Sequence, residues 1–386
     1  MSRAIASNAL TIFVILLLAV AGAIAWAKSS WTSEGPLTQA ICVEVPPGSS
    51  MLRVSNNLAE QGAVASASLF RMGANYTERS GLLKAGSFLI EPGASMEQIA
   101  MAVTESGRST CGTEINFRIG VLEADMIVRE LDPETQRYEE VADFIPGAEG
   151  VETPAEYTEA ANATGTRFRV TVAEGATSWQ VIDALKRADF LGGESGDVPP
   201  EGSLAPYSYE VQPGTDRGEL VASMQARQAT ILEELWQERV DGLPLETPEE
   251  AMILASIIEK ETGVPEERRQ VASVFVNRLE RGMRLQTDPT VIYGITEGEG
   301  ALGRGLRRSE LDRATPYNTY VIEGLPPTPI ANPGRESIAA ALDPASTDYV
   351  FFVADGTGGH AFAETLAEHN ENVARWRQVE AERTAN

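Results

Sequence analysis

Residues 247–282 read TPEEAMILASIIEKETGVPEERRQVASVFVNRLERG and contain the clearest helix signals in the chain. Thr247 and Glu250 have the spacing of a capping box, in which each side chain accepts a hydrogen bond from the other residue's backbone N–H. Pro248 stands at the first helical position, where its missing N–H costs nothing. The pattern predicts a helix over 248–262, ended by a glycine and apolar on nearly every face.

Two glutamates, Glu259 and Glu261, close this apolar run. On an ideal helix they point about 200° apart, so they face opposite ways. Burial and the negative end of the helix dipole would both raise the pKa of Glu261. A carboxylic acid kept protonated near neutral pH is what general-acid cleavage of a glycosidic bond requires. The alternative is an ordinary solvated residue in a fraying last turn, paired with Lys260 or Arg268.

The remaining C-terminal sequence predicts several short elements. A second helix is expected over 266–281, with valines, a phenylalanine and a leucine on one face and a glycine after it. A short strand, MRLQ, is expected at 283–286, and a helical turn capped by Asp288 follows. DYVFFVAD, GTGG and HAFA at 348–363 predict a hairpin, and a last capped helix starts from Thr365.

Near the N-terminus, residues 9–27 carry no charge and are long enough to cross a bilayer as a helix. Ala25-Trp26-Ala27 resembles a processing site, so a cleaved signal peptide is the competing interpretation. We favour an uncleaved anchor, with residues 1–8 in the cytoplasm, residues 28–40 as a polar tether, and the acidic body outside the cytoplasm.

The charge balance excludes some partners. The chain has 56 acidic and 31 basic residues, a net charge of −25, and a pI of about 4.5. Such a field repels nucleic acid and anionic membrane surfaces, so neither is expected as a partner. Cys42 and Cys111 lie beyond the apolar span, where disulfides persist, and we favour a bridge between them over two unrelated buried thiols. Two cysteines and two histidines argue against a structural zinc site.

A unit of strand, glycine turn, capping residue and helix recurs four times at irregular spacing before residue 241. Its first copy continues as strand, helix, helix, strand, which is the plan of a small glycan-binding module of the LysM kind. We therefore expect an α+β protein with these segments after the tether: a LysM-like subdomain at 41–108, an insertion or linker subdomain at 109–165, a connecting strand-turn-helix subdomain at 166–246, and a C-terminal α+β domain at 247–386.

Three segments carry a family resemblance: ASIIEKETGVPEERRQVASVFVNRLERGMRLQTDPTVIYG at 255–294, TPYNTYVIEGLPPTPIANPG at 315–334, and FFVADGTGGHAFAETLAEHN at 351–370. Together they closely resemble the endolytic murein transglycosylase family, also called YceG-like. The resemblance implies a single-pass inner-membrane protein whose periplasmic domain cuts peptidoglycan glycan strands internally. It also implies Glu261 as the catalytic acid, no cofactor, and peptidoglycan synthases (penicillin-binding proteins) as partners.

The resemblance implies a reaction that needs only one carboxylate. In that family the β-1,4 bond after N-acetylmuramic acid is cleaved without water, leaving a 1,6-anhydromuramyl end, whereas most glycosidases use two carboxylates. Two rivals remain. A muramidase would need a second carboxylate, with Asp288 the nearest candidate, and a non-catalytic scaffold would bind peptidoglycan through the LysM-like module alone.

The matching motifs also suggest residues that bind sugar or hold the cleft together: Gln286, Thr287, Asp288, Tyr317, Asn318, Tyr320, Asn332 and His360. A metal site at His360 or His369 lacks the usual spacing, and a hydrogen-bonded polar role is favoured for both. The sequence departs from the family at 201–211, EGSLAPYSYEV, where an aromatic stretch is usual. Residues 109–165 have no counterpart that the resemblance assigns.

Overall fold

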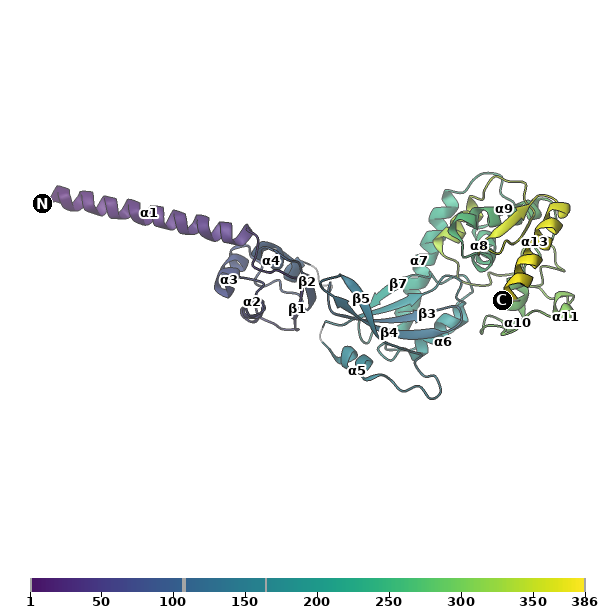
Figure 1. The fold of residues 1–386 in the computed structure, drawn as a ribbon, viewed down its shortest axis with the longest axis horizontal. Helices are drawn as coiled ribbons and strands as arrows, with labels where there is room; N and C mark the ends of the chain where they lie inside the picture. Colours follow the sequence, from purple (N-terminus) through teal and green to yellow (C-terminus); the bar gives the residue numbers. More distant parts are fainter. Residues whose placement is uncertain (1, 106–108, 164, 385–386) are drawn as a thin grey trace. The chain divides into compact units, whose positions relative to one another are not determined.

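The computed structural model describes residues 2–105, 109–163 and 165–384 (Figure 1). The expected segment ends at residues 1, 108 and 386 lie outside these ranges. The chain contains both helices and strands, in part as consecutive runs of one kind, so the α+β prediction is confirmed. Contacts divide the chain into a first unit, residues 1–116, 127–143 and 152–168, and a second unit, residues 117–126, 144–151 and 169–386.

The N-terminal helix α1 runs over Ser2–Thr32. Its stretch Leu10–Thr32 is long and apolar enough to cross a membrane, and the side chains there from Leu10 to Trp26 are exposed. The helix does not end at residue 27, after which the tether was expected, but continues to Thr32. Its last turn packs against the helices α3 (Ala67–Tyr76) and α4 (Met96–Glu105) of the first unit.

Packing around Trp31 explains why the helix continues. The Trp31 ring is buried and lies 5.9 Å from the ring of Phe70, centroid to centroid. It covers Gly73 so closely that a Cβ atom there would overlap the indole. Residues 33–40 continue this packing, since the N–H of Gly93 donates to the carbonyl of Leu37. The segment 28–40 is therefore not a free polar tether.

The rest of the first unit's N-terminal part has the order strand, helix, helix, strand, helix. Its elements are β1 (Ile41–Val45), α2 (Met51–Glu60), α3 (Ala67–Tyr76), β2 (Gly86–Ile90) and α4 (Met96–Glu105). β1 and β2 pair antiparallel, and Ser50 and Ser66 cap α2 and α3 by accepting backbone N–H groups. A disulfide joins Cys42 to the fully buried Cys111, with Cα atoms 5.6 Å apart.

A five-stranded sheet follows, in the order β5-β4-β3-β6-β7. Its strands are β3 (Thr113–Ile119), β4 (Ala124–Asp132), β5 (Arg137–Phe144), β6 (Arg167–Val172) and β7 (Ser208–Val211). The stretch 109–165, expected to be an insertion or linker, supplies three of these strands and the helix α5 (Ala155–Asn162).

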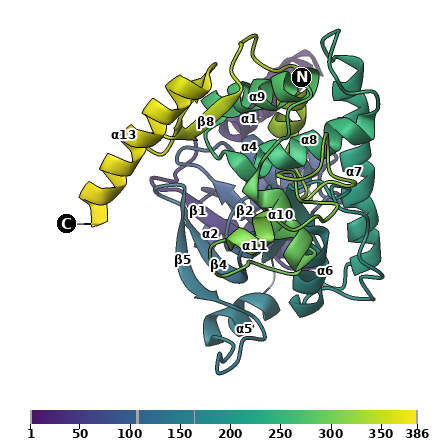
Figure 2. The same cartoon turned by 90° about the vertical axis from the view of Figure 1, so that its right-hand side faces the viewer.

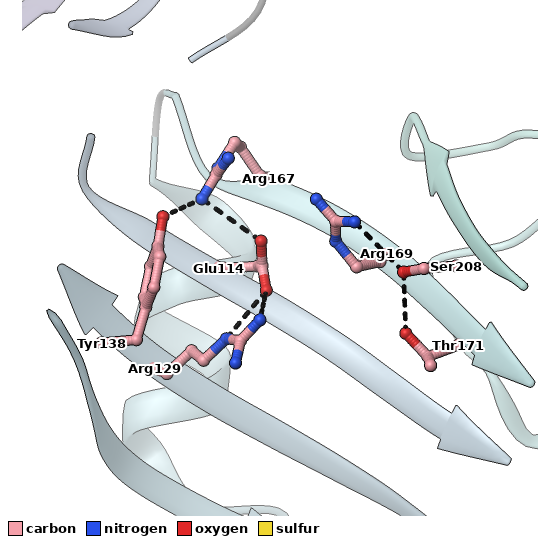
Figure 3. A network of polar contacts seen from close by, with 7 residues as sticks. All are labelled: Glu114, Arg129, Tyr138, Arg167, Arg169, Thr171 and Ser208. Atoms are coloured by element: carbon pink, nitrogen blue, oxygen red, sulfur yellow. Dashed lines mark hydrogen bonds and ion pairs between the residues drawn. The ribbon is translucent and has the colours of Figure 1, made fainter. Parts of the chain in front are cut away.

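One face of this sheet carries paired charges (Figure 3). Glu114, only 1% exposed, accepts a hydrogen bond of 2.8 Å from Arg129 Nε and forms an ion pair of 3.2 Å with Arg167. The Arg129 guanidinium lies 4.8 Å from the centre of the Tyr138 ring. A buried carboxylate is tolerated only when it is paired in this way.

The second unit is mostly helical. Its helices are α6 (Ser178–Arg187), α7 (Arg217–Gln237), α8 (Pro248–Glu261), the 3-10 turn η1 (Pro265–Glu267), α9 (Arg268–Glu280), α10 (Asp288–Thr296), α11 (Arg308–Leu311), α12 (Arg335–Leu342) and α13 (Leu366–Thr384). Strands β8 (Phe351–Ala354) and β9 (His360–Ala363) form the antiparallel hairpin that the sequence predicts.

Helix α8 packs against α7, α9 and α12. Figure 2 shows α8 beside α7 and α9. Every residue from Ala251 to Ile258 is buried, as the apolar run predicts. The expected capping box is half formed: Thr247 Oγ1 accepts from the N–H of Glu250, but the Glu250 carboxylate accepts from Glu246 instead of Thr247.

Between α9 and α10 the predicted strand at 283–286 is wrong, because these residues form an irregular segment. Gln286 adopts φ +50°, the left-handed region, which is incompatible with an extended strand. Its N–H donates to the Thr319 carbonyl at 3.1 Å. The segment therefore turns toward residues 317–320, and as a result Thr287 lies at the end of α8.

Candidate active site

The last residue of α8 meets the first residues of α10. The hydroxyl of Thr287 donates a short hydrogen bond to Glu261 Oε1. The backbone of Thr287 is fixed by a second contact, since its N–H donates to Thr319 Oγ1 at 3.0 Å. Glu261 is partly exposed as a residue and Thr287 is buried, so the donor that holds this carboxyl is itself fixed in the interior.

Glu259 and Glu261 point to different surroundings, as helical geometry predicts. Glu259 Oε2 accepts a 2.9 Å hydrogen bond from the N–H of Gly334, at the start of α12. A carboxylate at a helix N-terminus is favourable for the helix. Between the two, Lys260 Nζ donates to the carbonyl of Gly175 at 3.1 Å. Glu259 thus has a structural partner, and Glu261 remains the candidate for chemistry.

Opposing effects act on the pKa of Glu261. Burial raises this pKa above the ordinary value of 4.5, and the neighbouring carboxylate of Asp288 raises it further. The Thr287 hydrogen bond and the electrostatic influence of His360 and Arg278 act in the opposite direction. The net direction is upward. The acid form therefore persists to higher pH than in an ordinary glutamate, while the ionised form is not left without stabilisation.

Asp288 is tied to a tyrosine. It is the first residue of α10, and the helix cap is Thr287, so the prediction that Asp288 caps the helix is wrong. The Tyr320 hydroxyl donates to Asp288 Oδ1 at 2.6 Å. Burial and this bond both raise the pKa of Tyr320, which keeps the phenol protonated and donating.

A buried arginine and an oriented histidine border the acid. Arg278 donates from Nε to the Val350 carbonyl at 2.7 Å and from a terminal nitrogen to the Leu285 carbonyl at 2.6 Å. These bonds connect α9 to the residue before β8 and to the irregular segment. His360 Nδ1 lies 2.8 Å from Glu267 Oε2, and its backbone N–H donates to the same carboxylate. Both side chains are held in place.

Two asparagines of the candidate set are fully buried. The side-chain amide of Asn318 donates to three carbonyls of the 310–313 turn, those of Glu310, Leu311 and Arg313. That of Asn332 donates to the Ala176 carbonyl, and its oxygen accepts from the Leu204 N–H, both at 2.9 Å. These contacts favour the framework role over sugar binding for both residues.

Tyr317 lies away from Glu261, against Tyr293, with ring centroids 5.1 Å apart. Its hydroxyl lies 2.7 Å from Thr328 Oγ1. Both tyrosines line a cavity of about 580 Å³ that Glu261 does not line. The residues marked by sequence motifs are thus divided. Four of them lie around Glu261: Thr287, Asp288, Tyr320 and His360. Gln286 orients the segment beside Glu261, and Tyr317 lines the cavity instead.

Sequence reasoning missed Arg278, Glu267 and Glu201. Glu201 Oε1 accepts from the N–H of Ser178 at 2.8 Å, and burial raises the pKa of Glu201. Glu201 lies in a proline-rich and glycine-rich loop, and a glutamate in such a sequence is normally expected to be exposed to solvent. No periodic signal in the sequence marks these residues, because their partners come from distant segments.

Comparison with known proteins gives consistent relatives. A model described as the YceG-like family matches residues 43–375. The chain is 34% identical over 247 residues to the endolytic murein transglycosylase of Bacillus subtilis (strain 168), covering 54% of this chain and 65% of that protein. It is 24% identical over 341 residues to the protein of that name from Streptococcus pneumoniae (strain ATCC BAA-255 / R6), covering 86% and 58% respectively.

A crystal structure of a yceG-like protein from Listeria monocytogenes matches with a TM-score of 0.46 and 24% identity. That match covers 86% of this chain and 98% of the other. The alignments with the Bacillus and Streptococcus proteins span 65% and 58% of those relatives' lengths.

Proposed function

The chain belongs to the YceG-like family, and from that premise we propose that it is a lytic transglycosylase that cuts peptidoglycan glycan strands internally. The observation that carries the proposal is the setting of Glu261: a partly buried residue whose carboxyl has a raised pKa and is hydrogen-bonded by Thr287 at the end of the buried helix α8. An acid of this kind suits proton donation to a glycosidic oxygen.

In the proposed reaction, Glu261 gives its proton to the oxygen that links N-acetylmuramic acid to the following N-acetylglucosamine. The bond from the muramic acid C1 to that oxygen breaks, and the muramic acid's own 6-hydroxyl attacks C1. The Glu261 carboxylate then takes the proton of that hydroxyl. The product is a 1,6-anhydromuramyl end, and Glu261 returns to its acid form. Because the nucleophile belongs to the substrate, positioning replaces a second carboxylate.

The surroundings of Glu261 support both of its roles. A residue that first donates and then accepts a proton works best when its pKa lies near the working pH. Burial favours the acid form, whereas Arg278, His360 and the Thr287 hydroxyl favour the carboxylate. Asp288, the nearest candidate for a water-activating base, already accepts a hydrogen bond from Tyr320. That contact supports the route without water over hydrolysis.

We extend the proposal to the protein's place in the cell. Helix α1 would anchor the chain once in the inner membrane, with residues 1–8 cytoplasmic and the remainder periplasmic. The segment 41–108 would act as a LysM-like glycan-binding subdomain, although its end lies outside the described residues. Cutting strands near their site of synthesis would end elongation, with peptidoglycan synthases as neighbours.

Product analysis tests the activity. The full-length protein in detergent is incubated with purified sacculi, and the released fragments are weighed by mass spectrometry. We expect anhydromuramyl ends from the wild type and from Glu259→Gln, and none from Glu261→Gln. Reducing ends would indicate hydrolysis, release of nothing by the wild type would indicate a binding scaffold, and loss of activity in Glu259→Gln alone would overturn the assignment of the acid.

A further inference from the structure

The turn η1, which follows Glu261 after a short connection, carries a glutamate whose carboxylate holds a histidine of β9. Glu267 Oε1 accepts from the backbone N–H of His360 at 2.9 Å, and Glu267 Oε2 lies 2.8 Å from His360 Nδ1. Both oxygens of one carboxylate thus contact the same residue. The two side chains are mostly buried, with 17% of the Glu267 side chain and 18% of the His360 side chain exposed. Hydrogen bonds to an ionised carboxylate are among the stronger ones in proteins, so this pair holds its geometry firmly.

The connection between Glu261 and Glu267 is itself fixed by hydrogen bonds. The N–H of Thr262, at the end of α8, donates to the Ile258 carbonyl at 3.2 Å. The N–H of Val264 donates to Thr262 Oγ1 at 3.0 Å, and the N–H of Glu267 donates to the Val264 carbonyl at 3.2 Å. The histidine that Glu267 holds is close enough to lower the pKa of Glu261. The pair therefore stands beside the candidate acid in a defined position.

The packing around the pair restricts the imidazole ring. Gly359 precedes His360, and a Cβ atom at Gly359 would lie 2.4 Å from Glu267 Oε1, so a larger residue there would push the carboxylate away. The ring of Phe352, which packs against the core of the second unit, meets the imidazole edge to face, with centroids 5.3 Å apart. The carboxylate and the aromatic ring together fix the direction of the imidazole.

The second ring nitrogen of His360 is open. Among the residues that the structure describes, none hydrogen-bonds Nε2, and this atom is not one of the buried polar atoms left without a partner there, so solvent reaches it. A further carboxylate near the ring, that of Asp355, accepts instead from the N–H and the hydroxyl of Thr357. When a carboxylate holds the proton of one imidazole nitrogen, the other nitrogen of the neutral ring keeps its lone pair. Nε2 is therefore an open acceptor beside Glu261.

We propose that His360 Nε2 accepts a hydrogen bond from an O–H or N–H group of the sugar bound beside Glu261, and that Glu267 is the positioning residue that fixes the imidazole for this contact. A sugar donor that leaves water without finding an acceptor loses a hydrogen bond, and Nε2 supplies the acceptor. The inference rests on the proposed function and deepens it, since it names an atom that orients the sugar while its 6-hydroxyl attacks.

Glu267→Gln tests the positioning role, because an amide has only one acceptor oxygen. The His360 backbone N–H takes that oxygen, since it can only donate, and the amide NH₂ then faces Nδ1 as a donor. Nδ1 must accept, so the ring proton moves to Nε2 and the open acceptor becomes a donor. Glu266 is exposed on the same turn, so Glu266→Gln is the matched control for loss of one charge.

Spectra of the ring nitrogens report this change directly. The chain has two histidines, so full-length protein with isotope-labelled histidine, kept in detergent and made without a histidine tag, gives signals from two rings. His360→Phe identifies the ring by removing its signals. At about pH 8, where histidine is ordinarily neutral, the His360 proton should be on Nδ1 in the wild type and in Glu266→Gln, and on Nε2 in Glu267→Gln. A wild-type ring with its proton on Nε2, or on both nitrogens, would overturn the inference, whether or not the variants fold.

A double-mutant cycle on the cleavage of glycan strands tests whether the two residues act together. Glu267→Gln should lower kcat/KM by about tenfold or more, since one acceptor is lost and a donor faces the substrate donor, whereas Glu266→Gln should match the wild type. In the His360→Phe background, Glu267→Gln should cost almost nothing further, because its effect passes through the imidazole. Equal losses in both backgrounds would show that Glu267 acts without His360 and would refute its positioning role.

Failure of this inference is distinct from failure of the proposed function. If the wild type releases anhydromuramyl ends and Glu267→Gln behaves as Glu266→Gln does, only the role of the pair falls. If the wild type releases no anhydromuramyl ends, the proposed function falls, and the sugar contact that rests on it falls with it.

Discussion

Replacing Glu261 by glutamine should stabilise the fold while it removes the activity. Burial raises the pKa of Glu261 above 4.5. A carboxyl of this kind contributes stability that is fully present below its unfolded pKa and lost as pH rises through its folded pKa. At neutral pH the folded protein therefore bears a cost, about 1.4 kcal/mol for each unit of elevation. Glutamine keeps the shape and never ionises.

The expected gain is on the order of 1 kcal/mol near neutral pH, because the Thr287 hydrogen bond and the Arg278 guanidinium offset part of the burial cost. For a domain of this size that gain corresponds to about 2–4 °C in Tm. Thermal unfolding of the full-length wild type and Glu261→Gln in detergent, followed by circular dichroism between pH 4 and 8, measures it. The difference in Tm should be near zero at pH 4 and grow with pH.

Glu259→Gln is the matched control for this experiment. It removes the charge from the hydrogen bond to the Gly334 N–H, so it should lower stability by about 0.5–1 kcal/mol and leave turnover largely intact. A Glu261→Gln protein that is less stable than the wild type at every pH, or whose advantage shrinks as pH rises, would refute the reasoning about the buried acid.

Two further predictions concern the hydroxyl beside the acid and the disulfide. Thr287→Val removes a donor that favours the ionised form, worth about 1.5–3 kcal/mol for an ionic hydrogen bond, so the pKa of Glu261 should rise further. The alkaline limb of the kcat profile should then move to higher pH, whereas Thr287→Ser should leave it in place; movement to lower pH would contradict the contact. Cys42→Ser opens the bridge to Cys111, which joins positions 69 residues apart, and should cost about 2–4 kcal/mol in denaturant unfolding. Reductant should destabilise the wild type to the same extent and leave Cys42→Ser unchanged.

The helices and the hairpin of the second unit were predictable because their signals are local. Thr247 and Pro248 mark the start of α8, and Gly282, at φ +63°, follows the end of α9. The hairpin is encoded by apolar strands on either side of a glycine turn. Each of these features is decided by residues within a few positions of one another, so no tertiary information is needed.

The strands β3, β4 and β5 were missed for a physical reason. One face of these strands carries charges such as Arg129 and the buried Glu114, which form a compact network only when the strands pair. In the sequence of one strand alone, the same charged residues indicate a segment exposed to solvent. The expected strand at 283–286 failed for the opposite reason, since Gln286 is held in a left-handed conformation by contacts with a distant loop.

The candidate site was predictable in part. Helical geometry separated the two glutamates, and the family resemblance selected Glu261. The motifs also marked Asn318 and Asn332, which are fully buried, because a motif does not distinguish a residue that touches substrate from one that holds a loop. Arg278, Glu267 and Glu201 acquire their surroundings only after distant segments come together.

The burial of Trp31 has a mechanical consequence for the proposed anchor. Because α1 enters the first unit without a hinge and its indole is clamped over Gly73, rotation of the helix about its own axis must turn the first unit with it. In a bilayer, the rotational orientation of the first unit about the helix axis would follow that of the helix. A membrane partner that binds one side of α1 would thereby also set the direction in which the first unit faces.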